Sequence, residues 1–205
     1  MNSEDRTNDE TSPNWLERIG RLIGGEPKDR RQLVELLLLA RERGLMDRET
    51  LGMMLGALRM AERRVRDVMT ERPKMVVLRR DDDLEEVLRV AIESAHARIP
   101  VIGEDVDEVV GILLQKDLLE WLRQGREAEF RLQELMREVL IVPESMRLGG
   151  LLKELRSNRN HLAIVVDEYG STAGLVTLED VLEEIVGEIE DEHDDPDEGQ
   201  APEQG

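Results

Sequence analysis

Thr177 and Asp180 are three residues apart where a predicted strand passes into a helix, and this pair is able to do two kinds of chemistry. As a capping box, the Thr hydroxyl accepts a hydrogen bond from a free backbone N–H, and the acid at the third helical position accepts one in return. The same junction offers backbone N–H groups and a positive helix end, and the Asp carboxylate is able to hold the two hydroxyls of a ribose. Taken alone, the spacing favours the cap.

A second copy of this junction lies earlier in the chain. Asp117 matches Asp180, but Leu114 stands where the later copy has Thr177. The acid therefore recurs while the hydroxyl does not. One comparison leaves both interpretations open, and it predicts that any site at Asp117 is weaker or empty because the Thr partner is missing.

Other chemistries find little support. The chain of 205 residues has no cysteine and three histidines, which argues against disulfides, thiolate metal sites and a histidine-based metal centre. We find no Gly-rich loop with Gly-Lys-Ser/Thr, no His-Glu-x-x-His pair and no Gly-x-Ser-x-Gly elbow. The sequence therefore predicts neither an enzyme nor a protein metal site.

An internal repeat must position the two acids. An offset of 63 residues lays Arg98–Ile102 over His161–Val165 and Gly111–Leu113 over Gly174–Val176, with no gap between them. An amphipathic helix precedes each matched block, and a short apolar strand precedes each helix (Met75–Leu78 and Leu140–Val142). The paired strands are too apolar to alternate, so both of their faces should be covered. We expect an α/β (α+β) fold of two pseudo-symmetric β-α-β-β-α repeats that pack together and leave a cleft between them.

The two ends of the chain differ from this repeat. Before it, apolar residues crowd Leu33–Ala40, Gly44 is a natural helix end and Asp47 is able to cap a second helix, which predicts a helical hairpin. After it, residues 179–205 hold 13 acidic and no basic side chains, which accounts for much of the net charge of −19. Within it, the block Glu188–Glu198 repels itself and has little to bury, so we expect the chain from Asp191 onward to be disordered.

Five segments are therefore expected. They are a disordered or linker segment 1–27, an N-terminal helical segment 28–65, repeat 1 at 66–126, repeat 2 at 127–190 and an acidic disordered tail 191–205.

Long stretches of the sequence resemble a known family. Residues 66–70, 97–101, 111–119, 142–145 and 161–180 are similar to a tandem CBS-domain pair, and with residues 186–192 they resemble more narrowly the CorC family of magnesium and cobalt efflux proteins. The resemblance implies an adenine-nucleotide site (AMP, ADP or ATP, with Mg²⁺ if phosphates recruit it) in the cleft and a homodimer of modules. It also implies cofactor-binding roles: ribose contacts from Thr177 and Asp180, approaches from Thr70 and Arg98, and further positions at Val76 and Pro100.

A cytoplasmic, nucleotide-sensing regulator of magnesium or cobalt efflux is the function that this resemblance implies. The longest apolar run, Leu36–Ala40, has five residues where a membrane-spanning helix needs about 20, so we expect no membrane insertion and a membrane transporter as a partner instead. No nucleic acid is expected. The alternative is a non-catalytic interaction scaffold with no nucleotide in its cleft.

Overall fold

A computed structural model describes residues 27–125 and 129–187 of the chain, which divides into two units, residues 1–55 and residues 56–205. Nearly all of the predicted linker 1–27 and the whole predicted acidic tail 191–205 lie outside the described residues.

Both helices predicted near the N-terminus are present. Helix α2 (Arg30–Glu42) begins at Asp29, whose carboxylate accepts a hydrogen bond from the Gln32 amide at 2.9 Å. The chain leaves this helix through Gly44, whose φ of +71° is costly for residues with a Cβ. Helix α3 (Arg48–Met60) follows, and Asp47 accepts from the Thr50 amide at 2.6 Å, as the sequence predicts.

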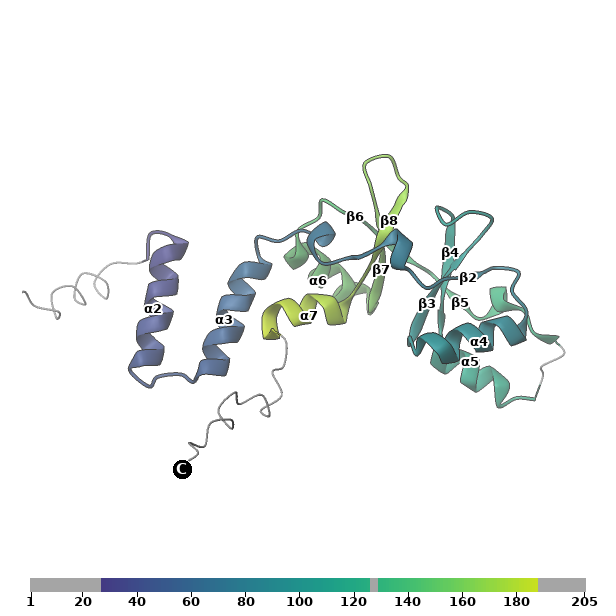
Figure 1. Ribbon diagram of the computed structural model, residues 1–205, viewed down its shortest axis with the longest axis horizontal. Helices are drawn as coiled ribbons and strands as arrows, with labels where there is room; N and C mark the ends of the chain where they lie inside the picture. The colour runs from purple at the N-terminus through teal and green to yellow at the C-terminus, as the bar shows by residue number, and fades with distance from the viewer. Residues whose placement is uncertain (1–26, 126–128, 188–205) are drawn as a thin grey trace, which may run out of the picture. The chain divides into compact units, whose positions relative to one another are not determined.

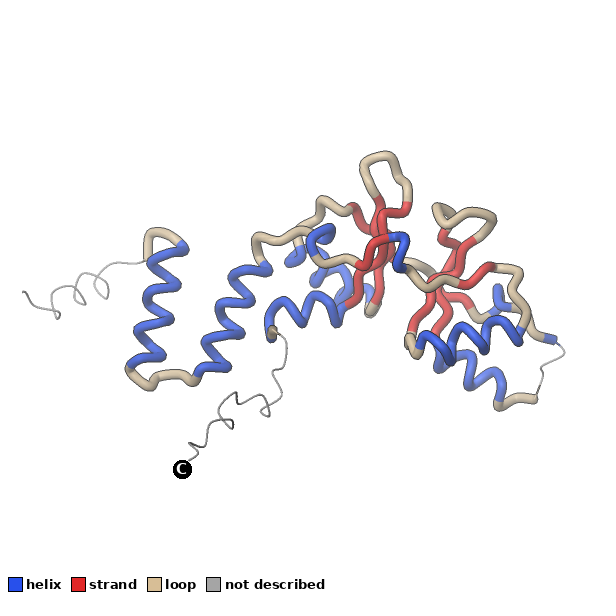
Figure 2. Tube along the Cα trace, viewed as in Figure 1, coloured by secondary structure: helices blue, strands red, loops and turns tan. Residues whose placement is uncertain are grey.

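Two four-stranded sheets form the second unit (Figures 1 and 2). Neither sheet is built from one repeat alone, because each takes an edge strand from the beginning of the other repeat. The strand orders are β1 (Thr70–Glu71), β8 (Thr172–Thr177), β7 (Leu162–Val166), β6 (Leu140–Pro143) in one sheet, and β2 (Leu78–Arg79), β3 (Arg98–Ile102), β4 (Val109–Leu114), β5 (Met136–Arg137) in the other.

Helices cover one face of each sheet. Helices α4 and α5 lie together beside the sheet that contains β3 and β4, while α6 and α7 lie beside the sheet that contains β7 and β8 (Figure 1). The bounds are α4 Leu84–Ser94, α5 Gln115–Leu122, α6 Leu148–Asn158 and α7 Leu178–Val186, with short 3₁₀ helices η1 Val65–Asp67, η2 Arg72–Lys74 and η4 Leu132–Glu134.

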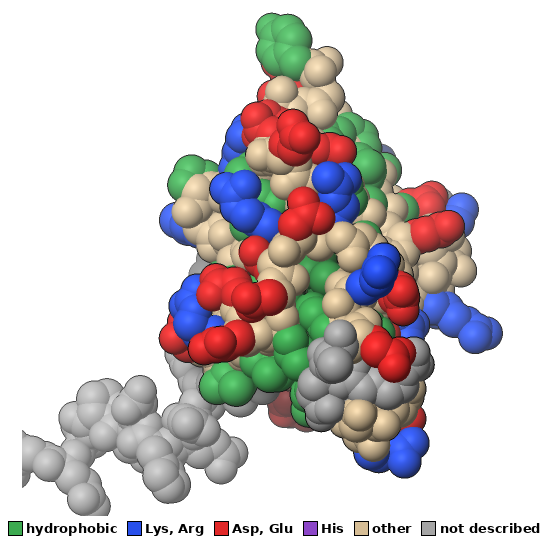
Figure 3. Space-filling view, turned by 90° about the vertical axis from the view of Figure 1, so that its right-hand side faces the viewer, with side chains coloured by type: hydrophobic (Ala, Val, Ile, Leu, Met, Phe, Trp, Pro, Cys, Tyr) green, Lys and Arg blue, Asp and Glu red, His purple; other side chains and the backbone are tan. Residues whose placement is uncertain are grey.

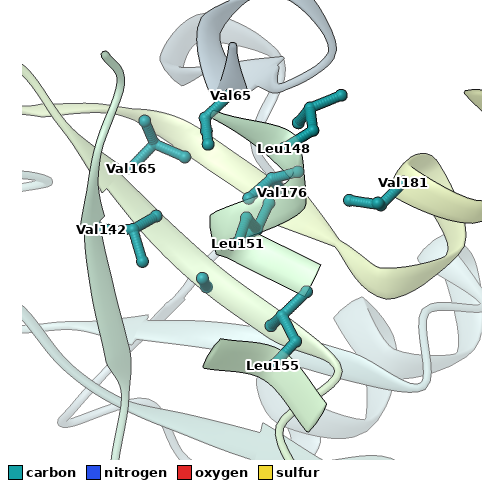
Figure 4. Close-up of a cluster of buried hydrophobic side chains, with 9 residues drawn as sticks. Val65, Val142, Leu148, Leu151, Leu155, Val165, Val176 and Val181 are labelled. Atoms are coloured by element: carbon teal, nitrogen blue, oxygen red, sulfur yellow. The ribbon is translucent and has the colours of Figure 1, made fainter. Parts of the chain in front are cut away.

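Each helix-covered face holds its own core. In the later sheet, Leu148, Leu151 and Leu155 of α6 meet Val165 and Val176 of the strands, all fully buried (Figure 4). The spacing of the three leucines at i, i+3 and i+7 places them on one face of α6, which is why the amphipathic pattern predicts the packing. The earlier sheet has an equivalent core between α4, α5 and its strands.

A third core joins the two sheets. Ile112 of β4 packs with Leu162 and Ile164 of β7, all nearly inaccessible to solvent. Strands β4 and β7 are thus covered on both faces, by helices on one side and by the other repeat on the other. The expected α/β pseudo-dimer of two repeats, preceded by helices, is confirmed.

Polar contacts also cross between the repeats. Asp107, in the turn between β3 and β4, accepts a hydrogen bond from the Thr172 amide at 2.9 Å and one from the Arg72 guanidinium at 2.8 Å. Arg72 also reaches Asp105 at the longer distance of 3.4 Å. One carboxylate therefore connects the turn of repeat 1 with the start of β8 and with η2.

The pairing registers correct the gapless alignment of the repeats. Leu114 pairs with Arg98, and Thr177 pairs with Leu162, so Arg98 is equivalent to Leu162. Strands β3 and β7 are therefore related by an offset of 64 residues rather than 63. The turn from β3 to β4 is one residue longer than the turn from β7 to β8, which absorbs the difference. The offset of 63 holds for β4, β8 and the helices that follow them.

The first predicted strand is also shorter than expected. Sheet pairing begins only at Leu78, so residues 75–77 are not part of a strand. The short helix η2 ends at Lys74, and the residues after it, Met75 and Val76, are half-buried and line a cavity.

The surface carries both signs of charge. On the face seen in Figure 3, acidic and basic side chains are interspersed, with hydrophobic side chains between them.

Candidate functional site

A cavity of about 410 Å³ opens between the two repeats, within the range of about 300–1,000 Å³ typical of small-molecule sites. All six residues that the resemblance marked as cofactor-binding line this cavity. They are Thr70, Val76, Arg98, Pro100, Thr177 and Asp180.

Thr177 and Asp180 form the capping box that their spacing predicts. The Asp180 amide donates to Thr177 Oγ1 at 3.1 Å, and Asp180 Oδ2 accepts from the Thr177 amide at 2.7 Å. The box leaves the Thr177 hydroxyl proton available to donate, and within the described chain no hydrogen bond is made to Asp180 Oδ1. Capping and ribose binding are therefore compatible, because they use different atoms of the same two side chains.

Arg98 and Thr70 line the cavity from different sheets, Arg98 from β3 and Thr70 from the edge strand β1 beside β8. Arg98 begins β3, is half-buried and makes no side-chain hydrogen bond or ion pair with any described residue. Its guanidinium is thus free to make forked hydrogen bonds to a phosphate. Thr70 lies in β1, opposite Leu175 of β8, so the exchange of the edge strand brings it to this cavity.

Val76 and Pro100 contribute to the apolar part of the lining. Pro100 is buried in β3, and Val76 lies in the segment 75–77 that does not join the sheet. Because Val76 precedes the first sheet pair, its backbone N–H and C=O are not used in a strand ladder. Such groups are able to recognise the polar edge of a flat ring such as adenine.

Sequence reasoning missed several lining residues. The turn after α4 supplies Ala95, His96 and Ala97, and Ala95 has a left-handed φ of 55°. His161 and Glu179 line the opposite side, with His161 Nδ1 and Glu179 Oε1 3.7 Å apart. The sequence could have predicted Glu179 as a lining residue, because it lies next to Asp180 where the strand passes into the helix. The turn after α4 has no recognisable motif that would have predicted its three residues.

A second, smaller cavity occupies the pseudo-symmetric position. Its volume is about 150 Å³, and Arg98, His161 and Leu162 line both cavities. Four of the other lining residues are the repeat equivalents of residues in the large cavity, with Arg137 for Thr70, Arg159 for Ala95, Leu114 for Thr177 and Lys116 for Glu179.

Asp117, the counterpart of Asp180, is already paired. Arg137 Nε donates to Asp117 Oδ2 at 2.7 Å and Arg137 Nη2 to Oδ1 at 2.9 Å. This bidentate pair uses both carboxylate oxygens, and its hydrogen bonds raise the pKa of the Arg137 guanidinium. The prediction that the Asp117 site is the weaker one agrees with this arrangement.

No group of three or more His, Asp or Glu side chains in residues 27–125 and 129–187 is arranged to hold a metal ion. Glu184 of α7 makes an ion pair with Arg63. Among the helices of the described segments, none is long and apolar enough to cross a membrane.

The fold and the cavity define a CBS-domain pair: the CBS domain family matches residues 65–124 and 132–187. A second match, described as the N-terminal region of NMB0537, covers residues 25–60. The magnesium and cobalt efflux protein CorC of Vibrio cholerae is 47% identical over 197 residues, which are 95% of this chain and 67% of that protein. The chain belongs to the CorC family, whose CBS-domain pair is a regulatory module and not a catalytic one.

Solved structures agree with this assignment. The CBS domain of a bacterial CNNM/CorC family Mg²⁺ transporter is 41% identical, has a TM-score of 0.73, and is matched over 80% of this chain and all of that one. A structure of the CBS domain of the bacterial CNNM/CorC family Mg²⁺ transporter in complex with ATP is 44% identical to this chain and has a TM-score of 0.63. The match covers 67% of this chain and 96% of that one. The chain spans about 60% to 67% of the length of its curated relatives.

Proposed function

We propose that this chain is a cytoplasmic regulatory module that binds an adenine nucleotide between its two CBS repeats and thereby regulates magnesium or cobalt efflux. The observation that carries the proposal is the convergence of Thr177, Asp180 and Arg98 on one cavity of about 410 Å³. A ribose holder and a free guanidinium in one apolar cavity match the parts of a nucleotide.

In this proposal, each group contacts a different part of the ligand. Asp180 Oδ1 accepts hydrogen bonds from ribose hydroxyls, and the Thr177 hydroxyl donates to a ribose oxygen. Adenine packs among the apolar side chains near Val76 and Pro100, and Arg98 pairs with phosphate. Thr70 contributes a hydroxyl from β1, the strand that pairs with β8.

A related structure supports the ligand class. The CBS domain of a bacterial CNNM/CorC family Mg²⁺ transporter, described above as a complex with ATP, shares 44% of its residues with this chain. ATP brings Mg²⁺ with it, held by phosphate oxygens and water rather than by a dedicated protein site.

Regulation requires the ligand to favour one arrangement of the module over another, because equal affinity for two arrangements shifts neither. The cavity lies between the repeats, so a bound nucleotide contacts both of them. The signal passes to a membrane transporter partner, and nucleic acid takes no part.

A homodimer through the CBS modules accompanies this function. Ile92 on α4 and Leu119 on α5 are 73% and 62% exposed, and Leu182 and Val186 of α7 are also exposed. Apolar side chains on neighbouring helices of both repeats are suited to a symmetric contact between copies. Light scattering of the purified chain tests this point, and a monomer at tens of micromolar would contradict it.

Thermal unfolding with and without nucleotide tests the proposal. A ligand at 100 times its dissociation constant stabilises the folded state by about 2.7 kcal/mol. For a chain of this size, that corresponds to a rise in Tm of about 5 to 11 °C. The scaffold alternative predicts no rise in Tm with AMP, ADP or ATP. Calorimetry that detects no binding heat at millimolar nucleotide would support the scaffold and contradict the proposed function.

A further inference from the structure

The two repeats place equivalent elements around two cavities, but the matching acid of each repeat has different hydrogen-bond partners in the two cavities. In the large cavity, Asp180 keeps one carboxylate oxygen without a hydrogen bond from the described residues. In the small cavity, both oxygens of Asp117 accept hydrogen bonds from Arg137.

The position of Arg137 in the sheet explains how it reaches Asp117. Thr70 pairs with Leu175 in β8, and Arg137 pairs with Ile112 in β4, so Thr70 and Arg137 occupy equivalent places on the two exchanged edge strands. At one place the side chain is a short hydroxyl, and at the other it is a long guanidinium that extends to the carboxylate.

We propose that Arg137 is the specificity determinant that restricts the module to one nucleotide, because its guanidinium holds the Asp117 carboxylate where a ribose would bind. This inference rests on the proposed function, since it explains why only one of the two equivalent cavities takes the ligand.

The volume of the small cavity and the charges at Asp117 and Arg137 also support this role of Arg137. The small cavity measures about 150 Å³ against about 410 Å³, and Asp117 is absent from its lining although Asp180 lines the large one. An ion pair between Asp117 and Arg137 is short and bidentate, so a neutral ribose has to displace a charge-assisted contact in order to bind. A carboxylate that is already paired contributes little to a nucleoside site.

Two other substitutions accompany Arg137. Leu114 replaces the hydroxyl of Thr177, and Arg159 replaces Ala95 at the left-handed turn, where φ is 53° and 55° respectively. A variant that makes the small cavity more like the large one therefore carries Leu114→Thr, Arg159→Ala and Arg137→Thr. The matched control carries Leu114→Thr and Arg159→Ala but keeps Arg137.

The experiment measures the stoichiometry of ATP binding to the full chain by calorimetry, with inorganic triphosphate as a control for binding to basic side chains alone. We expect one ATP per chain for the wild type and for the double variant, and two for the triple variant. Two ATP per chain in the wild type or the double variant would overturn the role of Arg137, as would one ATP in a folded triple variant. If inorganic triphosphate gives the same second binding event in calorimetry as ATP does, this result would also contradict a nucleoside site.

The outcome separates this inference from the proposed function. If the wild type binds no ATP, the proposed function fails, and the inference is then judged by whether the triple variant gains a site that the double variant lacks. If the triple variant does not fold, Arg137→Thr alone is titrated with adenosine and followed by NMR. Shifts at Asp117 that the wild type does not show support the inference, and unchanged spectra overturn it.

Discussion

Replacing Asp180 with alanine separates its two tasks, because the side chain both caps α7 and faces the cavity. Asp180 Oδ2 accepts from the Thr177 amide at 2.7 Å, and losing a cap of this kind costs about 1 kcal/mol. The unliganded variant should therefore melt about 2 to 4 °C lower than the wild type.

The effect on nucleotide binding is larger. A hydrogen bond from a ribose hydroxyl to the charged Oδ1 atom is worth about 1.5–3 kcal/mol, so losing one weakens affinity by about 10- to 150-fold. At a nucleotide concentration that stabilises the wild type by about 2.7 kcal/mol, the variant should gain only about 0.3–1.4 kcal/mol. The ligand-induced rise in Tm thus falls to half or less.

Asp83→Ala is the matched control. Asp83 caps α4 by accepting from the Glu86 amide at 2.9 Å and does not line the large cavity. This variant should lose a similar amount of stability while keeping the full nucleotide-induced rise in Tm. An Asp180→Ala protein whose calorimetric affinity stays within twofold of the wild type would refute the assignment of Oδ1 to the ribose.

Two further predictions concern the contacts that join the repeats. Gly174→Ala should lower stability by about 1–3 kcal/mol in chemical denaturation, because a Cβ there collides with the Thr70 carbonyl oxygen of the exchanged strand β1. Gly111→Ala, where the nearest atom is a side-chain carbon 2.9 Å away, should cost less, and a reversed order would contradict the role of β1. Asp107→Ala should cost about 1–3 kcal/mol because it leaves the partly buried amide at the start of β8 without its acceptor. Asp105→Ala, which loses the exposed 3.4 Å contact with Arg72 and the exposed 3.1 Å hydrogen bond from the Asp107 amide, serves as its control and should lower the denaturation midpoint less.

The repeat made the core and the large cavity predictable. Apolar spacing in α6 and the uninterrupted apolar character of β7 depend on local sequence, and both appear as predicted. The Thr177 and Asp180 pair is likewise local, because its geometry follows from the start of one helix. The six residues implied by the family resemblance line the large cavity, while their roles in binding stay a prediction.

What the sequence could not reveal depends on contacts between distant segments. Arg137 and Asp117 are 20 residues apart, and only the pairing of β5 with β4 brings them together. A gapless alignment also hid the extra residue in the turn from β3 to β4, because apolar strands match one another in either register. The segment 75–77 has the composition of a strand, but its neighbours lead it to the cavity rim instead.

The exchanged edge strands affect how this protein is made. Strand β1 leaves the ribosome more than 100 residues before its partner β8, since Thr70 pairs with Leu175. At about 5–20 residues per second, the short strand waits roughly 5–20 s for the partner that completes its sheet. The large cavity is therefore incomplete until nearly the whole described chain has been synthesised, so ligand present during translation meets a complete site only at the last step of folding.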